Sequence, residues 1–359
     1  MRRMIALILA VTGTVICLIA ACADKTPLPT NLPAPVYGGI DTNYVVISPN
    51  WTEFNGRALD HPNDVYVGYD QLIYICDTNN DRVIKLDIDG TFLAEYPVVH
   101  PVAITQDRGL DLLVVCGDYS RPEVVDGIDT VINYGDSVFR KRYRGDQPFA
   151  RVFQAPYPYY IFNDRPQAAQ FWSVAASFYP TKDYYLTDFW FGRLVEFSAS
   201  DIPVGYHLSD GVGLGLTRFP VDLTMYQIAG QNYVALAQAA GNIGVQLFSF
   251  PNWVGLYESG DTLPPLIRFS ARSYKDIAVD ELSNFYLLLD STDPLLGTNY
   301  YFYKFDRRGD VLLAFGELGT GEKQFRSPQG ICHFEGILYI ADAGNNRVVR
   351  MQLTTETRQ

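Results

Sequence analysis

Histidine is scarce in this sequence, with four copies in 359 residues, although it is the side chain best suited to acid, base and metal chemistry. His61 and His100 each precede a proline, and His333 lies in a predicted strand near the C-terminus. Three imidazoles around one point could hold zinc, and metal-bound water or a polarised oxygen would then react with a Tyr or Asp as base. These three histidines are therefore candidate metal ligands, with structural or solvated positions as the alternative.

Other catalytic patterns are absent or incomplete. The sequence contains no Gly-x-Ser-x-Gly elbow, no phosphate-binding Gly-rich loop and no His-Glu-x-x-His motif. Asp126 and Asp129 suggest calcium, but their spacing does not match the full loop signature. No catalytic residue is therefore assigned and no cofactor is predicted. The alternative is a bound zinc or calcium ion.

Aromatic side chains offer a second kind of candidate site, for recognition. The chain has 25 Tyr, 21 Phe and 4 Trp, and several of these rings gather in a proline-interrupted segment and in a predicted turn. Such rings give a large contact area at low entropic cost, which favours them at recognition surfaces for proteins and glycans. The alternative is that they fill gaps between repeats. The candidate binding residues are Tyr157, Tyr159, Tyr160, Phe189 and Trp190.

A repeated unit organises the chain that must position these residues. Segments 62–93 and 327–350 contain short apolar strands separated by Gly, Asn and Asp, which are hairpin signals. Weaker copies fill the middle, and the second strands end at positions 77, 118, 188, 238, 290 and 342. This period predicts six repeats with an insertion in the second, at about 119–166. Four strands per repeat favour an all-β propeller over a solenoid.

The repeat resembles the NHL repeat, a propeller blade with a Pro-led first strand, an Asp-x-x-Asn-x-Arg turn and a Gly-led fourth strand. The resemblance covers about residues 44–353 and implies a six-bladed β-propeller of four-stranded antiparallel blades. The last copy lacks a fourth strand, whereas 44–48 form a spare strand before the first copy. We expect this N-terminal strand to complete the sixth blade and close the ring, which would pair both exposed sheet edges.

The Asp and Arg of the blade turn recur in three copies at the same separation, and a carboxylate there can accept backbone N–H groups or pair with the guanidinium. They are therefore expected to hold the turn between the second and third strands, without a catalytic role. The three pairs are Asp77 with Arg82, Asp188 with Arg193, and Asp342 with Arg347.

The resemblance also implies where a site would lie. Function in such propellers sits at the mouth of the central channel, on loops that lead into the innermost strands, and His61 and His100 occupy that position in neighbouring blades. The peptide-amidating lyase is an NHL-type propeller with a His-ligated zinc, which the set completed by His333 resembles in part. That family takes its ligands from blades spaced around the ring, whereas these three histidines come from consecutive blades.

The N-terminus resembles a bacterial lipoprotein signal. Arg2 and Arg3 precede an uncharged apolar stretch that ends in Ile-Ala-Ala-Cys22, and the stretch is shorter than the ~20 apolar residues of a membrane-spanning helix. Residues 1–21 are therefore predicted to be a cleaved signal peptide, and Cys22 is the predicted lipid attachment site. Ala23 directly after this cysteine implies the outer membrane, because the family uses Asp there for retention at the inner membrane.

Two further segments follow, a Pro-rich tether at 22–42 and one propeller domain at 43–359. Cys76, Cys116 and Cys332 are expected to be free and to act as small apolar side chains, with a bridge between the first two as the alternative.

The charge balance excludes nucleic acid as a partner, because 28 Lys and Arg stand against 40 Asp and Glu, a net charge of −12. The sequence therefore predicts a membrane-anchored NHL-type lipoprotein of the bacterial envelope that binds a protein or a glycan. The alternative is a propeller enzyme, a metal-dependent lyase or hydrolase with its site at the central channel.

Overall fold

The computed structural model describes residues 40–125, 128–145, 147–155, 160–162, 165–167, 169–178, 182–240, 243–256, 274–289 and 301–357. Tyr44–Thr354 form one compact unit, and Met1–Asn43 with Thr355–Gln359 form another. The expected signal peptide, Cys22, the tether up to residue 39, Tyr157 and Tyr159 lie outside the described residues. No helix among the described residues is long and apolar enough to cross a membrane.

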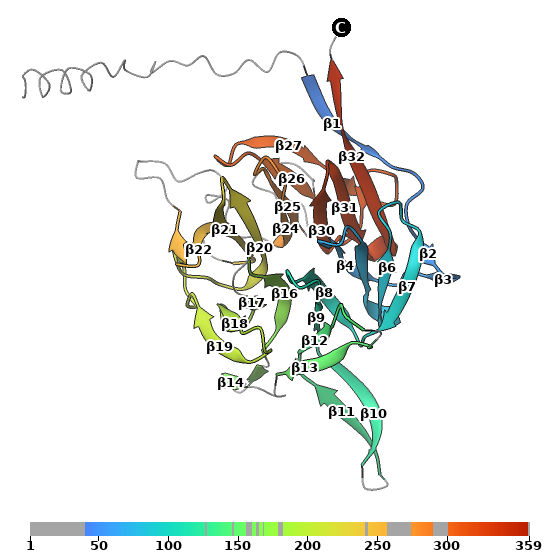
Figure 1. Cartoon of the computed structure of the whole chain (residues 1–359), viewed down its shortest axis with the longest axis vertical. Coiled ribbons are helices and arrows are strands. Elements are labelled where there is room, and N and C mark those ends of the chain that lie inside the picture. Colours follow the sequence, from blue (N-terminus) through green and yellow to red (C-terminus); the bar gives the residue numbers. More distant parts are fainter. Residues whose placement is uncertain are drawn as a thin grey trace, which may run out of the picture. The chain divides into compact units, whose positions relative to one another are not determined.

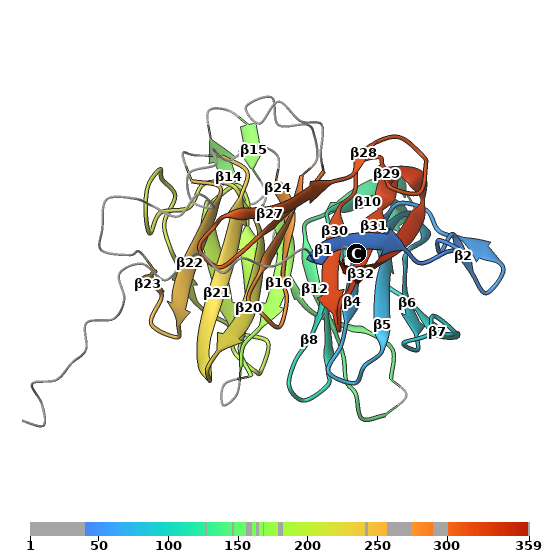
Figure 2. The same cartoon turned by 90° about the horizontal axis from the view of Figure 1, so that it is seen from above.

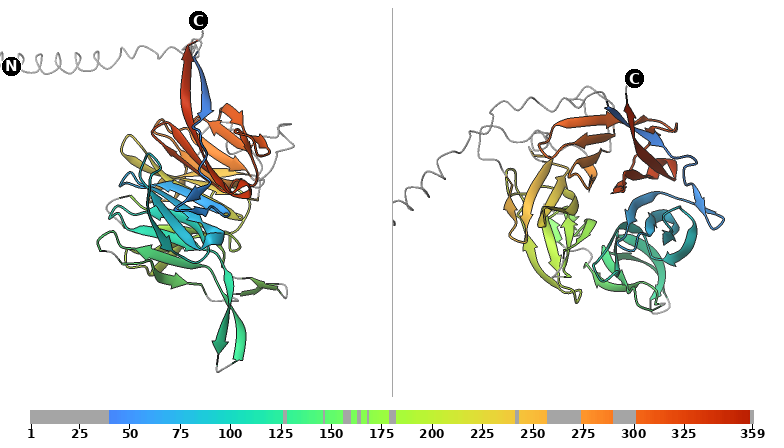
Figure 3. Two further views of the ribbon diagram at one scale, coloured as in Figure 1. Left: turned by 90° about the vertical axis from the view of Figure 1, so that its right-hand side faces the viewer. Right: turned by 45° about the horizontal axis from the view of Figure 1, so that its top comes forward.

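The described chain forms six four-stranded antiparallel blades of a β-propeller, as the repeats predict (Figures 1 and 3). The first three blades are β4 (Pro62–Val67), β5 (Ile73–Asp77), β6 (Arg82–Leu86) and β7 (Phe92–Pro97); β8 (Pro101–Gln106), β9 (Leu112–Cys116), β12 (Ser137–Lys141) and β13 (Ala150–Gln154); and β16 (Phe171–Ala176), β17 (Tyr184–Asp188), β18 (Arg193–Phe197) and β19 (Pro203–His207).

The last three blades are β20 (Pro220–Ile228), β21 (Gln231–Gln238), β22 (Val245–Phe250) and β23 (Val254–Gly255); β24 (Tyr274–Val279), β25 (Phe285–Leu289), β26 (Phe302–Phe305) and β27 (Val311–Phe315); and β30 (Gly330–Phe334), β31 (Ile337–Asp342), β32 (Arg347–Thr357) and β1 (Ile40–Val46).

Burial explains why the strands of one blade differ in sequence pattern. The second strands β5 and β9 are buried at every residue, because blades pack on both of their faces, and each is a continuous apolar run that ends in Asp or Cys. The outer strand β7 alternates between exposed and half-buried residues, as a strand with one solvated face does. Cys76, Cys116 and Cys332 are free, as expected.

The N-terminal strand closes the ring as the sequence predicts. β1 is the outermost strand of blade six and pairs with β32, and beyond it the N–H of Ile47 donates to the carbonyl oxygen of Arg350 at 2.8 Å (Figures 1 and 2). Tyr44 is 1% exposed and packs with side chains of blades five and six. The two ends of the propeller sequence therefore meet in one sheet.

The segment 119–166 contains two hairpins, whereas the sequence pattern treated it as one insertion. β10 (Tyr119–Val125) and β11 (Ile128–Tyr134) form a hairpin that projects from blade two (Figure 1), and β14 (Tyr160–Phe162) pairs with β15 (Arg165–Gln167). β12 and β13, the third and fourth strands of blade two, lie between these hairpins in the chain. Shorter elements elsewhere are β2 (Glu53–Phe54), β3 (Arg57–Ala58), β28 (Glu317–Leu318), β29 (Gln324–Phe325) and the 3₁₀ turns Thr78–Asn80 and Ala343–Asn345.

The repeated Asp and Arg residues hold the blade turns, as expected. Asp77 and Arg82 face each other at the ends of β5 and β6, and Arg82 Nε donates to Asp77 Oδ2 at 2.7 Å. The other carboxylate oxygen of Asp77 accepts the N–H of Asp60 at 2.8 Å, which fixes the loop that leads into the blade. The equivalent Nε–Oδ2 distances are 3.0 Å for Arg193 with Asp188 and 2.8 Å for Arg347 with Asp342.

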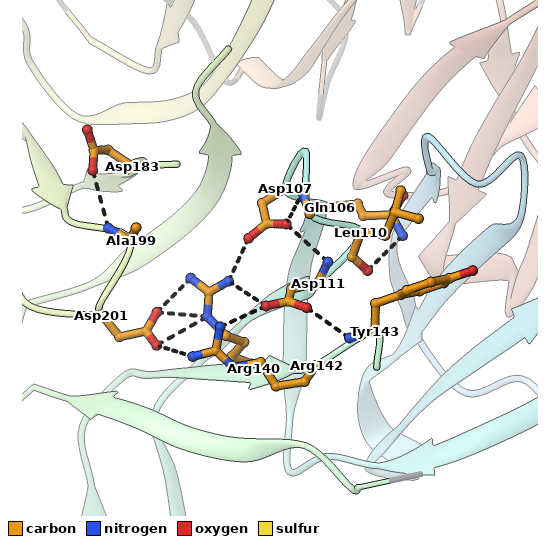
Figure 4. A network of polar contacts seen from close by, with 11 residues as sticks. Gln106, Asp107, Leu110, Asp111, Arg140, Arg142, Tyr143, Asp183, Ala199 and Asp201 are labelled. Atoms are coloured by element: carbon orange, nitrogen blue, oxygen red, sulfur yellow. Dashed lines mark hydrogen bonds and ion pairs between the residues drawn. The ribbon is translucent and has the colours of Figure 1, made fainter. Parts of the chain in front are cut away.

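A buried ion network joins blade two to the turn after β18 in blade three (Figure 4). Arg140 on β12 donates through Nη1 to Asp107 Oδ2 at 2.8 Å and through Nη2 to Asp201 Oδ1 at 2.7 Å. Its Nε also contacts Asp201, at 2.9 Å, so this pair is bidentate. Arg142 reaches Asp111 from the solvent side at 2.8 Å. The network therefore couples two blades that are separate repeats in the sequence.

Candidate functional site

The innermost strands of the six blades, β4, β8, β16, β20, β24 and β30, pack in turn around a central channel. Two cavities occupy this channel. The first cavity, about 230 Å³, lies where the chain enters these strands, and the second cavity, about 240 Å³, lies further along them. Residues that line the first cavity include His61, Asn63, His100, Trp172, Lys275 and Gln329, and those of the second include Tyr66, Thr105, Met225, Cys332 and His333.

Polar side chains lie between the two cavities. Asp64, Ser173, Asp222 and Asp276 line both of them. They occupy the same position in the innermost strands of blades one, three, four and five, and Gly330 is the equivalent in blade six. A Cβ atom at Gly330 would lie 2.8 Å from the Cα of Asp64, so glycine permits the close contact of blades six and one.

Each of these three carboxylates accepts a hydrogen bond from the next blade. The accepting Oδ2 atoms and their donors are Asp64 with the N–H of Ile104 at 2.8 Å, Asp222 with the N–H of Ile277 at 2.9 Å, and Asp276 with the N–H of Ile331 at 2.6 Å. The hydroxyl of Ser173 also donates to Asp222. The carboxylates thus tie neighbouring blades together and at the same time line the channel.

The channel environment disfavours ionisation of these carboxyl groups. Burial raises the pKa of Asp64 to about 7, and it raises that of Asp136, beside the first cavity, to about 8. Burial and then the neighbouring charge of Asp222 raise the pKa of Asp276 well above its ordinary value. Sequence reasoning missed these residues, although the alignment of the innermost strands would have placed Asp64, Asp222 and Asp276 at one level.

The structure brings His61 and His100 into one cavity and places His333 in the other. His100 Nδ1 lies 3.1 Å from the carbonyl oxygen of Asp118, and burial lowers the pKa of His61. His333 stacks on Tyr286 with ring centroids 5.4 Å apart, and its Nδ1 lies 3.5 Å from Glu281 Oε2. The three candidate ligands therefore do not surround one point. Over the described parts of the chain, no three His, Cys, Asp or Glu side chains group as metal ligands.

Phe189 and Trp190 belong to an aromatic stack that begins at the first cavity. The ring of Phe189 lies between those of Trp172 and Phe219, at centroid distances of 4.6 and 4.9 Å. Trp190 meets Phe189 edge-on at 5.1 Å and is 44% exposed. Because Trp172 lines the first cavity, these four rings, called here the aromatic stack, run from the cavity to the surface.

The remaining aromatic candidates are Tyr157, Tyr159 and Tyr160. Tyr157 and Tyr159 are outside the described residues, and for Tyr160 the structure gives the backbone of β14 only. Sequence reasoning did not select Trp172, which follows Phe171 inside β16, or Phe219, which directly precedes β20. The repeat position of Trp172, which Asn63 and Lys275 share in other blades, is the signal that would have found it.

Lys275 brings an ammonium group to the same wall of the first cavity. Its Nζ lies 5.1 Å from the centroid of the Trp172 ring, within the distance of a cation–π contact. The first cavity thus combines an aromatic ring, one lysine, two histidines, several amide side chains and a group of carboxyls. A few convergent polar groups on a partly apolar wall are typical of small-molecule binding sites.

No protein-family model matches the chain, and no curated protein sequence matches it. Among solved structures, a Bacteroides thetaiotaomicron protein of unknown function has a TM-score of 0.56 at 14% identity, covering 88% of this chain and 76% of that one. An auxiliary nutrient binding protein from the same species has a TM-score of 0.55 at 9% identity, covering 88% and 77%. A Xanthomonas campestris gluconolactonase has a TM-score of 0.50 at 11% identity, covering 88% and 97%. At these identities the likeness shows a shared propeller fold alone.

Proposed function

We propose that this protein is an NHL-type propeller lipoprotein, anchored through Cys22 to the outer membrane of a bacterial envelope, that binds a glycan at the mouth of its channel. The lipoprotein part rests on the N-terminal sequence pattern, and the NHL part rests on the repeated Asp-x-x-Asn-x-Arg turn. The binding part rests on the residues that line the first cavity.

The aromatic stack beside the first cavity is the observation that carries this proposal. Trp172 forms part of the cavity wall. Its ring packs nearly parallel to that of Phe189, with an interplanar angle of 7°, and Phe189 packs on Phe219 at 19°. A ring held in this way keeps one orientation, so a flat ligand face would find a preorganised contact surface. Sugar rings present such apolar faces together with a rim of hydroxyl groups.

Polar side chains around the same cavity suit the hydroxyl rim of a sugar. Asn63, Gln170 and Gln329 line the first cavity, and each amide offers both donors and an acceptor. The carboxylates of the channel add acceptors for hydroxyl hydrogens. The Bacteroides propeller described as an auxiliary nutrient binding protein is an example of this fold used for binding.

Glycan binding by the membrane-extracted chain tests the proposal. The chain, purified in mild detergent, is applied to a glycan array, and the strongest hit is titrated by calorimetry. We expect Trp172→Ala to lose at least about tenfold in affinity, about 1.4 kcal/mol, because the ring supplies the main apolar contact. Trp172→Phe, which keeps a stacking ring, should retain most of the affinity.

Tyr206→Ala serves as the matched control, because this ring is 58% exposed on β19 and does not line the first cavity. It should bind as the wild type does. Unchanged affinity in Trp172→Ala, with a folded protein by circular dichroism, would place the ligand elsewhere and overturn the proposal. Binding of a protein partner with no glycan hit would overturn it as well.

A further inference from the structure

We infer that the ligand of the first cavity carries a positively charged amine, as an amino sugar does. This inference rests on the proposed function, because it names the chemical class of the saccharide that the cavity selects. It follows from the charges that line the cavity, from the contact between Lys275 and Trp172, and from the absence of basic partners for the lining carboxyls among the described residues.

Acidic groups outnumber basic ones on the wall of the first cavity. Among the described residues that line the cavity, Lys275 is the one lysine or arginine, and burial lowers the pKa of His61. Among the described residues, none of the lining carboxyls lies within 4.0 Å of a Lys, Arg or His nitrogen, whereas Asp77 and Asp342 in the blade turns are paired. The lining carboxyls are Asp64, Asp118, Asp136, Asp222 and Asp276.

This distribution of carboxyls fits an organic cation better than a metal ion. The five side chains come from blades one, two, four and five, and Asp222 is a close neighbour of Asp276. No three of them gather as metal ligands within the described residues. A compact metal ion needs several ligand atoms around one point. An ammonium group on a larger molecule needs only one or two carboxylates nearby, while its hydroxyls reach the others.

The Trp172 ring already holds an ammonium group, that of Lys275, at 5.1 Å. Aromatic faces attract cations of this kind, and tryptophan attracts them most strongly. A ligand amine would therefore find the same ring and the same negative surroundings that attract the lysine. Lys275 and the ligand amine compete for this position, so removal of the lysine charge should strengthen binding.

Cation binding should release protons from the channel. Asp64, with a pKa of about 7, and Asp136, with a pKa of about 8, are partly or mostly protonated at neutral pH in the free protein. A nearby positive charge favours the ionised form of a carboxyl and lowers its pKa, so protons leave as the amine binds. The other titratable groups that line the cavities are His61, His100, Asp118 and Lys275 in the first, Tyr66, Tyr69, Cys332 and His333 in the second, and Asp222 and Asp276 in both.

A matched set of three sugars tests the charge preference, because they differ only at C6. Calorimetry at pH 7 compares 6-amino-6-deoxyglucose, glucose and glucuronate, which carry an ammonium, a hydroxyl and a carboxylate there. We expect the amino sugar to bind at least about tenfold more tightly than glucose, and glucuronate to bind most weakly. Titrations in two buffers of different ionisation enthalpy should show net proton release with the amino sugar and none with glucose.

Two variants assign this preference to the channel. Asp64→Asn keeps an acceptor for the N–H of Ile104 but removes the charge, so it should lose about tenfold in amino-sugar affinity and should lose less in glucose affinity. Lys275→Gln should bind the amino sugar more tightly than the wild type does. Asp129→Asn, at an exposed position on the hairpin strand β11 that lines neither cavity, removes the same charge and should change neither affinity.

The outcomes separate this inference from the proposed function. Equal or tighter binding of glucose or glucuronate, with continued dependence on Trp172, would overturn the charge inference and leave a glycan site. Spermidine that binds as tightly as the amino sugar would support the cationic class and overturn the glycan. If Lys275→Gln weakens amine binding, the two ammonium groups do not compete for one position, and this result would overturn the inference.

Discussion

Buried charged residues of this protein have two different roles, which depend on whether a partner is present. Arg140 is 1% exposed at its side chain and satisfies its guanidinium with carboxylates from two blades (Figure 4). Asp64 and Asp276 in the channel have backbone N–H donors but no basic partner among the described side chains. The first arrangement is complete within the protein, whereas the second leaves carboxyl groups without a basic partner among the described residues, and we propose that a cationic ligand supplies it.

Replacement of Arg140 by Met should destabilise the fold strongly. Asp107 would lose its basic partner and Asp201 would keep only the longer contact to Arg142 at 3.5 Å, and the loss of a buried ion-pair partner costs about 3–5 kcal/mol. Urea unfolding followed by fluorescence measures the change in free energy of unfolding. Arg142→Met is the control, because this neighbour is 56% exposed and its ion pairs should contribute no more than about 1 kcal/mol. Equal stability of the two variants would contradict the account of the network.

At the scale of elements, β1 is the strand on which ring closure depends. Its residue Tyr44 hydrogen-bonds through its hydroxyl to the Tyr286 hydroxyl of blade five at 2.7 Å, and its ring stacks on Phe315 at 5.7 Å. The next residue, Val45, is 48% exposed, since successive side chains of a strand point to opposite faces. One residue of β1 therefore joins blade six to blade five while its neighbour faces solvent.

Truncation of Tyr44 should open this closure. We expect Tyr44→Ala to lower the free energy of unfolding by about 3–5 kcal/mol, the usual range for a large buried aromatic side chain. Val45→Ala removes an exposed side chain from the same strand and should cost about 0.5 kcal/mol or less. Thermal unfolding of both variants measures the difference. A small effect at Tyr44 would mean that the ring does not depend on its N-terminal strand.

At the scale of the whole molecule, six blades enclose a channel whose carboxyls come from distant parts of the chain. Each of Asp64, Asp222 and Asp276 binds the backbone of the following blade, so the ligand cavity and the contacts between blades share the same atoms. Ionisation of the channel should therefore change stability as well as binding.

The stability of the whole propeller should decrease as the pH rises toward the alkaline range. The pKa of Asp136 is raised to about 8 in the folded protein against ~3.9 in an unfolded chain. The contribution of Asp136 to the free energy of unfolding is fully present below about pH 4, and it is lost as the pH rises through about 8. We expect the Tm to fall between pH 5 and pH 8.5, and Asp136→Asn to reduce this fall by at least about 2–4 °C. Calorimetric scans measure it, and exposed Asp129→Asn should show the wild-type dependence.

The sequence by itself determined the repeats, the six blades, the strand that closes the ring and the Asp–Arg pairs of the turns. These features depend on local hydrogen bonds and on a fixed period, so residues close in sequence, such as Asp77 and Arg82, already specify them. The closing strand could be predicted as well, because the sixth repeat has three strands of its own and needs a fourth, which the N-terminal segment supplies.

Only the tertiary structure decided which side chains meet in the channel. Asp64 and Asp276 lie more than two hundred positions apart in sequence yet line the same cavities, and Trp172 on β16 contacts Phe189 in the turn that follows β17. His61 and His100 precede their innermost strands, whereas His333 lies near the end of its own, so His333 faces the second cavity. Position along the innermost strand, rather than the type of residue, determines which cavity each side chain enters.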